Sequence, residues 1–152
     1  MPFTPFHLGP AFFLWTLFRK HIYLPAILLG SVVLDIEPFL VLFMNLDSNL
    51  HGLSHTFLFA ALVSALLAWF LFFLGRKHFD KLKIPFQTLL ASFVLGTFSH
   101  VFLDSLIYND ILPFWPISIN PFLGLLGTAN AYGNTVWVCL IAGVLGLSLF
   151  AV

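Results

Sequence analysis

The chain is divided into five long apolar segments, at residues 5–18, 24–44, 51–75, 86–108 and 133–151. Of its 152 residues, 61% are hydrophobic and only 8% are charged, and the mean hydropathy is +1.05. Soluble domains carry far more charge, whereas a run of about 20 apolar residues crosses a bilayer as a helix. We therefore predict an all-α, polytopic integral membrane helix bundle of about five helices, formed by residues 1–152 as a single domain.

Prolines predict two irregular stretches, one inside the second apolar segment and one before the last helix. Pro38 lies inside the second apolar segment, and its ring would clash with the carbonyl four residues earlier, so we expect that helix to break around residues 35–38. Pro113, Pro116 and Pro121 interrupt the stretch before the last helix, which we expect to be interfacial or re-entrant. The first residues hold no basic cluster, so we expect no removable signal peptide.

The basic residues predict the orientation. All six fall in two stretches, Arg19-Lys20 and residues 76–83. The positive-inside rule places both stretches in the cytoplasm, with the N-terminus outside and the C-terminus cytoplasmic in a plasma membrane. The bilayer is thus the first expected partner. So few cations exclude a nucleic-acid-binding face, and the sequence leaves the oligomeric state open.

Seven potential metal ligands lie in or beside the apolar segments. A charged side chain in hydrocarbon costs a few kcal/mol unless it meets a partner, an ion or a cavity. At a rise of ~1.5 Å per residue from each basic end, most of the seven lie at ~17–30 Å, in the outer half of the membrane. We therefore expect one shared site. Its candidate ligands are His7, Asp35, Glu37, His51, His55, His100 and Asp104.

Two pairs in this set have helical spacing. His51 with His55, and His100 with Asp104, are four residues apart and would share one helix face. Imidazole and carboxylate ligands without thiolate favour a divalent metal, zinc first and then Mn, Fe or Co, as one or two ions. Such a site activates water for hydrolysis. We assign the general base to Glu37 or Asp35, because both flank the predicted break.

Other interpretations remain open for individual residues and for the whole site. His7 could hydrogen-bond between helices, His51 could lie at the interface, and Asp35 and Glu37 could cap the broken helix. Ser54, Thr56, Ser99 and Ser105 neighbour the ligands and are candidate orienting groups. The polar residues could also serve metal-ion binding or transport, or only the assembly of a non-enzymatic membrane factor.

The order of motifs resembles a known family. An N-terminal Pro-Phe-Thr-x-x-His is followed by Asp-x-Glu-Pro, by His55-Thr56 and by Ser99-His100-x-x-x-Asp104. This is similar to the small prokaryotic membrane-bound predicted metal-dependent hydrolases, which are thought to be distant relatives of zinc-dependent phospholipase C and related single-strand nucleases. The resemblance covers roughly residues 1–121. It implies hydrolysis of a phosphoester, such as a lipid or another membrane-associated substrate. It implies metal-ligand roles for His7, Asp35, Glu37, His55, His100 and Asp104.

The chain departs from the family pattern at two places. Many members have Asp-x-Asp-His, whereas Pro38 follows Glu37 here, which leaves the metal number at one or two. Many members also have His-Arg-Gly-x-[Ser/Thr]-His, and aligning Gly52 and His55 puts His51 at the arginine position. His51 thus either replaces a phosphate-facing arginine or supplies a shifted ligand.

Overall fold

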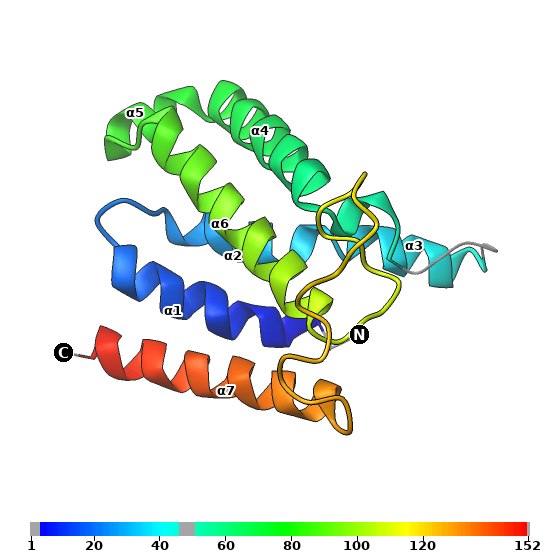
Figure 1. The fold of residues 1–152 in the computed structure, drawn as a ribbon. Helices are drawn as coiled ribbons and strands as arrows, with labels where there is room; N and C mark the ends of the chain where they lie inside the picture. Colours follow the sequence, from blue (N-terminus) through cyan, green and yellow to red (C-terminus); the bar gives the residue numbers. More distant parts are fainter. Residues whose placement is uncertain (1–3, 46–50, 152) are drawn as a thin grey trace.

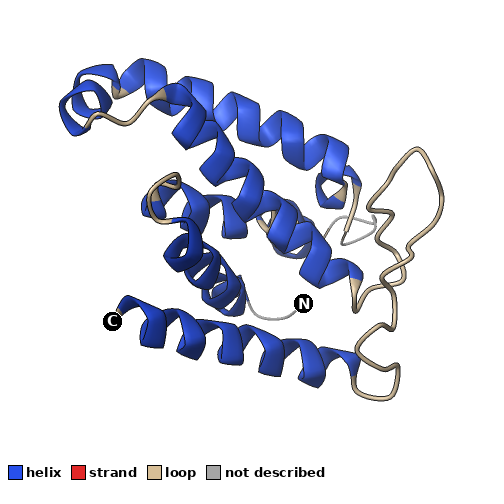
Figure 2. Ribbon diagram, turned by 60° about the vertical axis from the view of Figure 1, so that its left-hand side comes forward, coloured by secondary structure: helices blue, strands red, loops and turns tan. Residues whose placement is uncertain are grey.

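A computed structural model describes residues 4–45 and 51–151 as a helical bundle (Figures 1 and 2). The described residues contain helices and no β-strand, which confirms the predicted fold class. The polar stretch between the second and third apolar segments also predicts a turn over residues 45–50, which lies, apart from Asn45, outside the described residues. The elements are a 3-10 turn η1 (Thr4–His7), α1 (Leu8–Phe18), α2 (Leu24–Val33), α3 (Ile36–Phe43), a 3-10 turn η2 (Leu53–His55), α4 (Phe57–Leu74), α5 (Arg76–Leu82), α6 (Phe86–Ser105) and α7 (Ala131–Phe150).

Four helical stretches in the described residues are long and apolar enough to cross a membrane. They are Leu24–Phe43, which combines α2 and α3, and the helices α4, α6 and α7. With 18 to 20 residues each, they reach ~27–30 Å, about the thickness of the hydrocarbon core. The first predicted helix also forms, but α1 has 11 residues and is only ~16 Å long. A fifth crossing therefore stays a prediction.

The predicted break in the second apolar segment is confirmed. The break falls at Leu34 and Asp35, just before Pro38, and α3 begins at Ile36. Pro38 therefore sits in the first turn of α3, where a missing backbone N–H costs nothing. The Asp35 side chain makes no capping hydrogen bond to α3, so the capping interpretation is wrong for this residue.

The start of α4 differs from the prediction. The helix predicted from the third apolar segment, α4, begins at Phe57 and not at residue 51. The reason is that Thr56 has extended backbone angles and caps the helix, its side-chain oxygen accepting a hydrogen bond from the Phe59 N–H at 3.1 Å. His55 belongs to the preceding 3-10 turn. His51 and His55 consequently do not form a pair on one helix face.

Small residues bring two pairs of helices into close contact. A Cβ atom added at Gly96 of α6 would overlap the carbonyl oxygen of Ile27 in α2, and one added at Gly30 would lie 2.9 Å from the carbonyl oxygen of Phe93. Between α1 and α7, a Cβ atom at Gly9 would overlap the Cys139 carbonyl oxygen. Such close backbone approach is typical of helix packing in membranes, where small residues allow the van der Waals contact that holds helices together in the absence of a hydrophobic driving force.

The two ends of the bundle differ in character. The α1–α2 connection, which carries Arg19 and Lys20, lies at the same end as α5 and the C-terminus (Figure 1). The N-terminal turn, the break between α2 and α3 and the irregular residues 106–130 lie at the opposite end in both views. The predicted irregular segment is confirmed there, and its Pro113 carbonyl accepts a hydrogen bond from the Phe57 N–H at 2.9 Å.

Candidate metal centre

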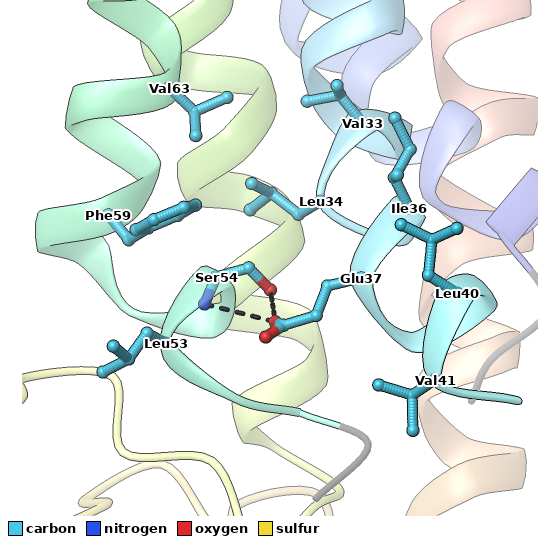
Figure 3. Close-up of a pocket in the computed structure, with 10 residues that line it drawn as sticks. All are labelled: Val33, Leu34, Ile36, Glu37, Leu40, Val41, Leu53, Ser54, Phe59 and Val63. Atoms are coloured by element: carbon cyan, nitrogen blue, oxygen red, sulfur yellow. Dashed lines mark hydrogen bonds between the residues drawn. The ribbon is translucent and has the colours of Figure 1, made fainter. Parts of the chain in front are cut away.

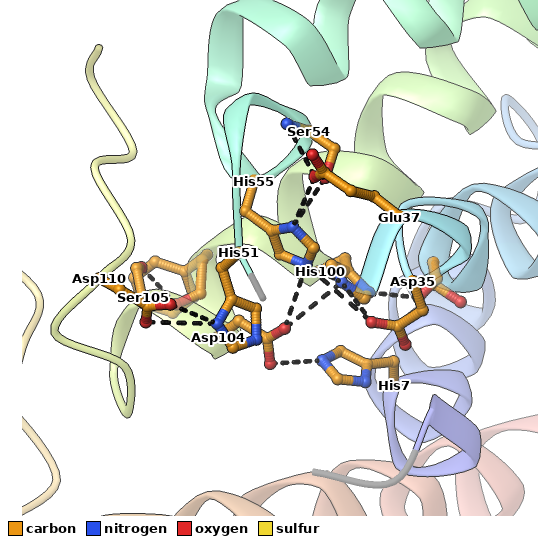
Figure 4. Close-up of polar contacts among 12 residues, drawn as sticks. His7, Asp35, Glu37, His51, Ser54, His55, His100, Asp104, Ser105 and Asp110 are labelled. Atoms are coloured by element: carbon orange, nitrogen blue, oxygen red, sulfur yellow. Dashed lines mark hydrogen bonds and ion pairs between the residues drawn. The ribbon is translucent and has the colours of Figure 1, made fainter. Parts of the chain in front are cut away.

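Four predicted ligands meet in the interior of the bundle (Figure 4). They come from the end of the bundle opposite the α1–α2 connection and α5, which carry the basic residues (Figure 1). Asp35 comes from the break between α2 and α3, His55 from the turn before α4, and His100 and Asp104 from the last turns of α6. Their side chains are buried, and one ligand atom from each lies within 4.8 Å of all the others. The predicted pairing of His100 with Asp104 on one helix face is confirmed.

The distances between these ligand atoms fit a metal ion. The two imidazole Nε2 atoms of His55 and His100 are 3.3 Å apart, and Asp104 Oδ2 lies 3.6 and 3.4 Å from them, respectively. Asp35 Oδ1 is 3.4 Å from His100 Nε2 and 3.9 Å from His55 Nε2. A tetrahedral zinc ion with bonds of ~2.0–2.1 Å holds its ligand atoms roughly 3.3–3.4 Å apart. The group is thus close to tetrahedral spacing and widest between Asp35 and His55.

The backbone of α2 sets the tautomer of His100. Its Nδ1 lies 2.8 Å from the carbonyl oxygen of Ser31, which can only accept a hydrogen bond. Nδ1 therefore carries the proton, and Nε2 presents its lone pair to the carboxylates. The close α2–α6 contact at Gly30 and Gly96 makes this hydrogen bond possible, because it brings the Ser31 carbonyl to the α6 surface.

Ser54 and Glu37 set the tautomer of His55. The Ser54 hydroxyl donates to Glu37 Oε2, and its oxygen accepts from His55 Nδ1 at 2.8 Å. The Ser54 N–H also donates to Glu37 Oε2, at 3.3 Å. Burial lowers the pKa of His55 below its ordinary value, although the contact with Asp104 acts in the opposite direction. His55 is thus neutral, with Nε2 free to act as a ligand.

These tautomers create a set of acceptors that calls for a cation. Two imidazole lone pairs converge with two carboxylate oxygens, and Asp104 Oδ2 is buried without a hydrogen-bond partner. Buried acceptors without donors are costly, and two carboxylates offset the charge of one divalent ion. The residues present therefore fit a metal ion on the chemistry of the ligands as well as on their spacing.

His7 lies beside this group. Its Nε2 is 3.2 Å from Asp104 Oδ1, and its ring stacks on His100 with the ring centres 4.3 Å apart. The contact joins the N-terminal turn to α6, which agrees with the interhelical hydrogen bond considered from the sequence. A ligand role for His7 stays a prediction, and its contact positions Asp104.

His51 makes a different set of contacts. Its Nδ1 lies 3.1 and 3.2 Å from the two carboxylate oxygens of Asp110, and its ring centre is 4.2 Å from that of Tyr108 and 4.9 Å from that of His55. His51 Nε2 is buried with no hydrogen-bond partner. Burial also raises the pKa of Tyr108, so its phenol stays protonated. His51 adjoins the four-ligand group without joining it, and its ligand role stays a prediction.

Glu37 lies behind His55, not among the four ligands. Its Oε2 is 4.0 Å from His55 Nδ1, on the ring edge away from the metal-facing Nε2. The carboxylate packs against Gly52, where an added Cβ atom would lie 2.5 Å from Oε1. The direct-ligand role of Glu37 stays a prediction, while its contact with Ser54 orients His55.

The structure also shows which orienting groups the sequence identified. Of the four hydroxyls considered, Ser54 contacts a ligand, whereas the hydroxyls of Thr56, Ser99 and Ser105 donate to backbone carbonyls three residues earlier. Asp110 was missed as the partner of His51. The only signal in the sequence is that Asp110 is one of just six acidic residues in the chain and follows Asp104 by six positions.

The helices and the buried His/Asp group define a multi-pass membrane protein with a candidate metal centre. A family model described as "YdjM inner membrane protein" matches residues 4–151, so the chain belongs to the YdjM inner membrane protein family. No curated protein and no solved structure gives a significant match to the chain. The family match supports the prokaryotic membrane part of the resemblance stated above. Kinship with hydrolases or phospholipase C stays a prediction.

Proposed function

We propose that this protein is a membrane-embedded, metal-dependent hydrolase of a phosphoester. The observation that carries the proposal is the convergence of four acceptors, from Asp35, His55, His100 and Asp104, at spacings near those of a zinc ion. A divalent ion bound there supplies Lewis-acid polarisation and lowers the pKa of water. Zinc suits the ligands best, with Mn, Fe or Co as alternatives and one or two ions as the range.

The structure favours Asp35 over Glu37 as the general base. Asp35 carries a carboxylate in the ligand group, with its longest contact, 3.9 Å, to His55. It also lies at a helix break, where small backbone adjustments are easier than inside a helix. Glu37 acts as a positioning residue through Ser54, because the His55 ring separates it from the ligand atoms. His55, His100 and Asp104 would then be the principal holders of the ion, and the Asp35 carboxylate beside them would be the group placed to accept a proton from water.

The orientation is part of the proposal. All six basic residues fall in two stretches that lie at one end of the bundle, which supports a cytoplasmic position for that end. The metal centre would then lie in the outer half of the membrane. Cysteines introduced one at a time at Lys81 and at Asn120, in addition to the buried native Cys139, are exposed to a membrane-impermeant reagent in intact cells to test it. Only Asn120→Cys should react.

Elemental analysis of the detergent-purified protein tests the metal site. We expect about one to two divalent ions per chain, lost in His100→Ala and in Asp104→Asn and retained in His78→Ala, whose side chain belongs to α5 at the other end. Wild-type protein without stoichiometric transition metal would overturn the proposal in favour of an assembly factor. Turnover of a chromogenic phosphodiester, abolished by a chelator and restored by the metal, then tests hydrolysis. Exchangeable metal without turnover would favour ion transport.

A further inference from the structure

A large apolar pocket lies next to the candidate metal centre. It has a volume of about 660 Å³ and lies between the α2–α3 stretch and the start of α4 (Figure 3). Eight of its ten lining residues are aliphatic or aromatic, and the two polar ones are Glu37 and Ser54. Its size is that of a small-molecule site, for which ~300–1,000 Å³ is usual. A pocket lined this way selects an apolar ligand with one polar end.

The pocket is continuous with the lipid-facing surface of the protein. Ile36, Leu40, Leu53 and Phe59 line it and are themselves 56%, 43%, 52% and 39% exposed. Three of these residues belong to the candidate membrane spans Leu24–Phe43 and Phe57–Leu74, whose exposed side chains meet hydrocarbon. Lipid chains are therefore the molecules that reach the mouth of this pocket at the highest concentration.

The polar end of the pocket adjoins a metal-facing histidine. Glu37 and Ser54 are joined by hydrogen bonds in Figure 3, and the Ser54 oxygen accepts from His55 Nδ1. Ser54 satisfies Glu37 Oε2, while the Glu37 side chain is still 37% exposed. A carboxylate beside hydrocarbon is stabilised by further donors, such as the hydroxyl groups of a glycerol headgroup. The apolar pocket thus has its polar end at Glu37 and Ser54, and Ser54 contacts His55 of the metal centre.

We propose that this pocket binds one acyl chain of a bilayer lipid that enters sideways from the membrane. The headgroup hydroxyls of the lipid then lie at Glu37 and Ser54, beside His55. The inference deepens the proposed function and rests on it in one respect, since the bound lipid would carry the phosphoester that the metal centre hydrolyses. Binding of the chain itself needs no catalysis and can be measured separately.

Photocrosslinking tests the binding. The protein is placed in nanodiscs of phosphatidylethanolamine and phosphatidylglycerol that contain a phosphatidylglycerol with a diazirine in its acyl chain, and the labelled peptides are quantified by mass spectrometry. We expect labelling concentrated on residues 33–41 and 53–63. Val63→Trp and Leu40→Trp should each reduce it by about tenfold, because excluding even two methylene groups costs that factor. Leu66→Trp, on the same helix and 64% exposed outside the pocket, is the matched control and should leave it unchanged.

The outcomes separate the inference from the proposed function. Labelling spread evenly around the lipid-facing surface, or unchanged in both tryptophan variants while their metal content equals that of wild type, would overturn the pocket. If wild-type protein turns over a soluble phosphodiester but shows no localised labelling, the inference fails and the function stands. Localised labelling in a wild-type protein that turns over neither soluble nor lipid phosphoesters supports the pocket and overturns the function.

Discussion

Two helix contacts in this molecule are built alike, yet only one carries a site. The α2–α6 contact and the α1–α7 contact both rely on glycines at which an added Cβ atom would meet the backbone of the neighbouring helix. Only the first brings ionisable residues together, because α6 carries His100 and Asp104 and the break that follows α2 carries Asp35. The described part of α7 contains no ionisable residue besides Cys139 and Tyr132. Close packing is thus common to both contacts, whereas the site also needs a broken helix.

Burial follows the same division. In the α2–α3 span and in α6, 44% of an 18-residue apolar stretch is buried inside the protein, compared with 17% of such a stretch in α4 and in α7. The ligand-bearing spans are therefore central, and the others are mostly exposed to lipid. Ionisable side chains in a membrane protein face the interior for this reason. We therefore expect that a disruptive substitution in the central contact, α2–α6, prevents both folding and metal binding. A disruptive substitution in the outer contact, α1–α7, should leave metal binding intact.

The largest effect is expected from Gly96→Leu. The new side chain would overlap the Ile27 carbonyl oxygen, and a backbone atom cannot move aside as a flexible side chain can. The cost should exceed the ~1–3 kcal/mol of ordinary overpacking, and the Ser31 carbonyl would be withdrawn from His100. We expect little monodisperse protein in size-exclusion chromatography, and no bound metal in what remains. A folded, metal-loaded variant would contradict the account of the α2–α6 contact.

A smaller effect is expected from Gly146→Leu in the outer contact. A Cβ atom there would lie 2.8 Å from a ring carbon of Phe12 and 3.1 Å from the Cα atom of Phe13. We expect a loss of about 1–3 kcal/mol in unfolding free energy, with metal per folded chain unchanged. Thermal unfolding and elemental analysis of the same sample measure both. Loss of metal in this variant would show that the α1–α7 contact, like the α2–α6 contact, is needed for metal binding.

Within the central region, Ser54→Ala tests how its histidines are oriented. The change removes the acceptor of the His55 Nδ1 proton and leaves all four ligands in place. Loss of such an outer contact weakens metal affinity by about 10–100-fold, which competition with a chromophoric chelator measures. Ser99→Ala is the control, because that hydroxyl donates only to the Gly96 carbonyl at 2.8 Å. Equal affinities in both variants would show that Ser54 does not orient the ligand.

Much of this arrangement could be predicted from local sequence. The membrane spans follow from apolar length, the break from Pro38, and the His100–Asp104 pair from helical spacing. The same spacing misled for His51 and His55, because a four-residue interval has no meaning outside a helix and Thr56 caps α4 only at Phe57.

Other features depend on the tertiary structure. The contact of His51 with Asp110 joins residues 59 positions apart, and no local pattern encodes it. The hydrogen bond from His100 to Ser31 involves a backbone carbonyl, which every residue possesses. Such contacts follow from how the helices pack, so a single sequence predicts the ligands better than the groups that orient them.

The smallest effect is expected from Ser64→Ala, where α4 packs on α6 through hydroxyls instead of glycine. Ser64 Oγ lies 2.9 Å from Thr97 Oγ1 and donates to the Ala60 carbonyl at 2.7 Å. Thr97 retains the Val94 carbonyl, at 3.3 Å, as an acceptor once Ser64 is truncated. The loss should therefore be near the ~0.6 kcal/mol average for hydrogen bonds between membrane helices, with no change in metal. A loss of unfolding free energy as large as that of Gly146→Leu would contradict this. It would mean that the hydroxyl contact between α4 and α6 stabilises the bundle as strongly as close backbone packing at the glycines does.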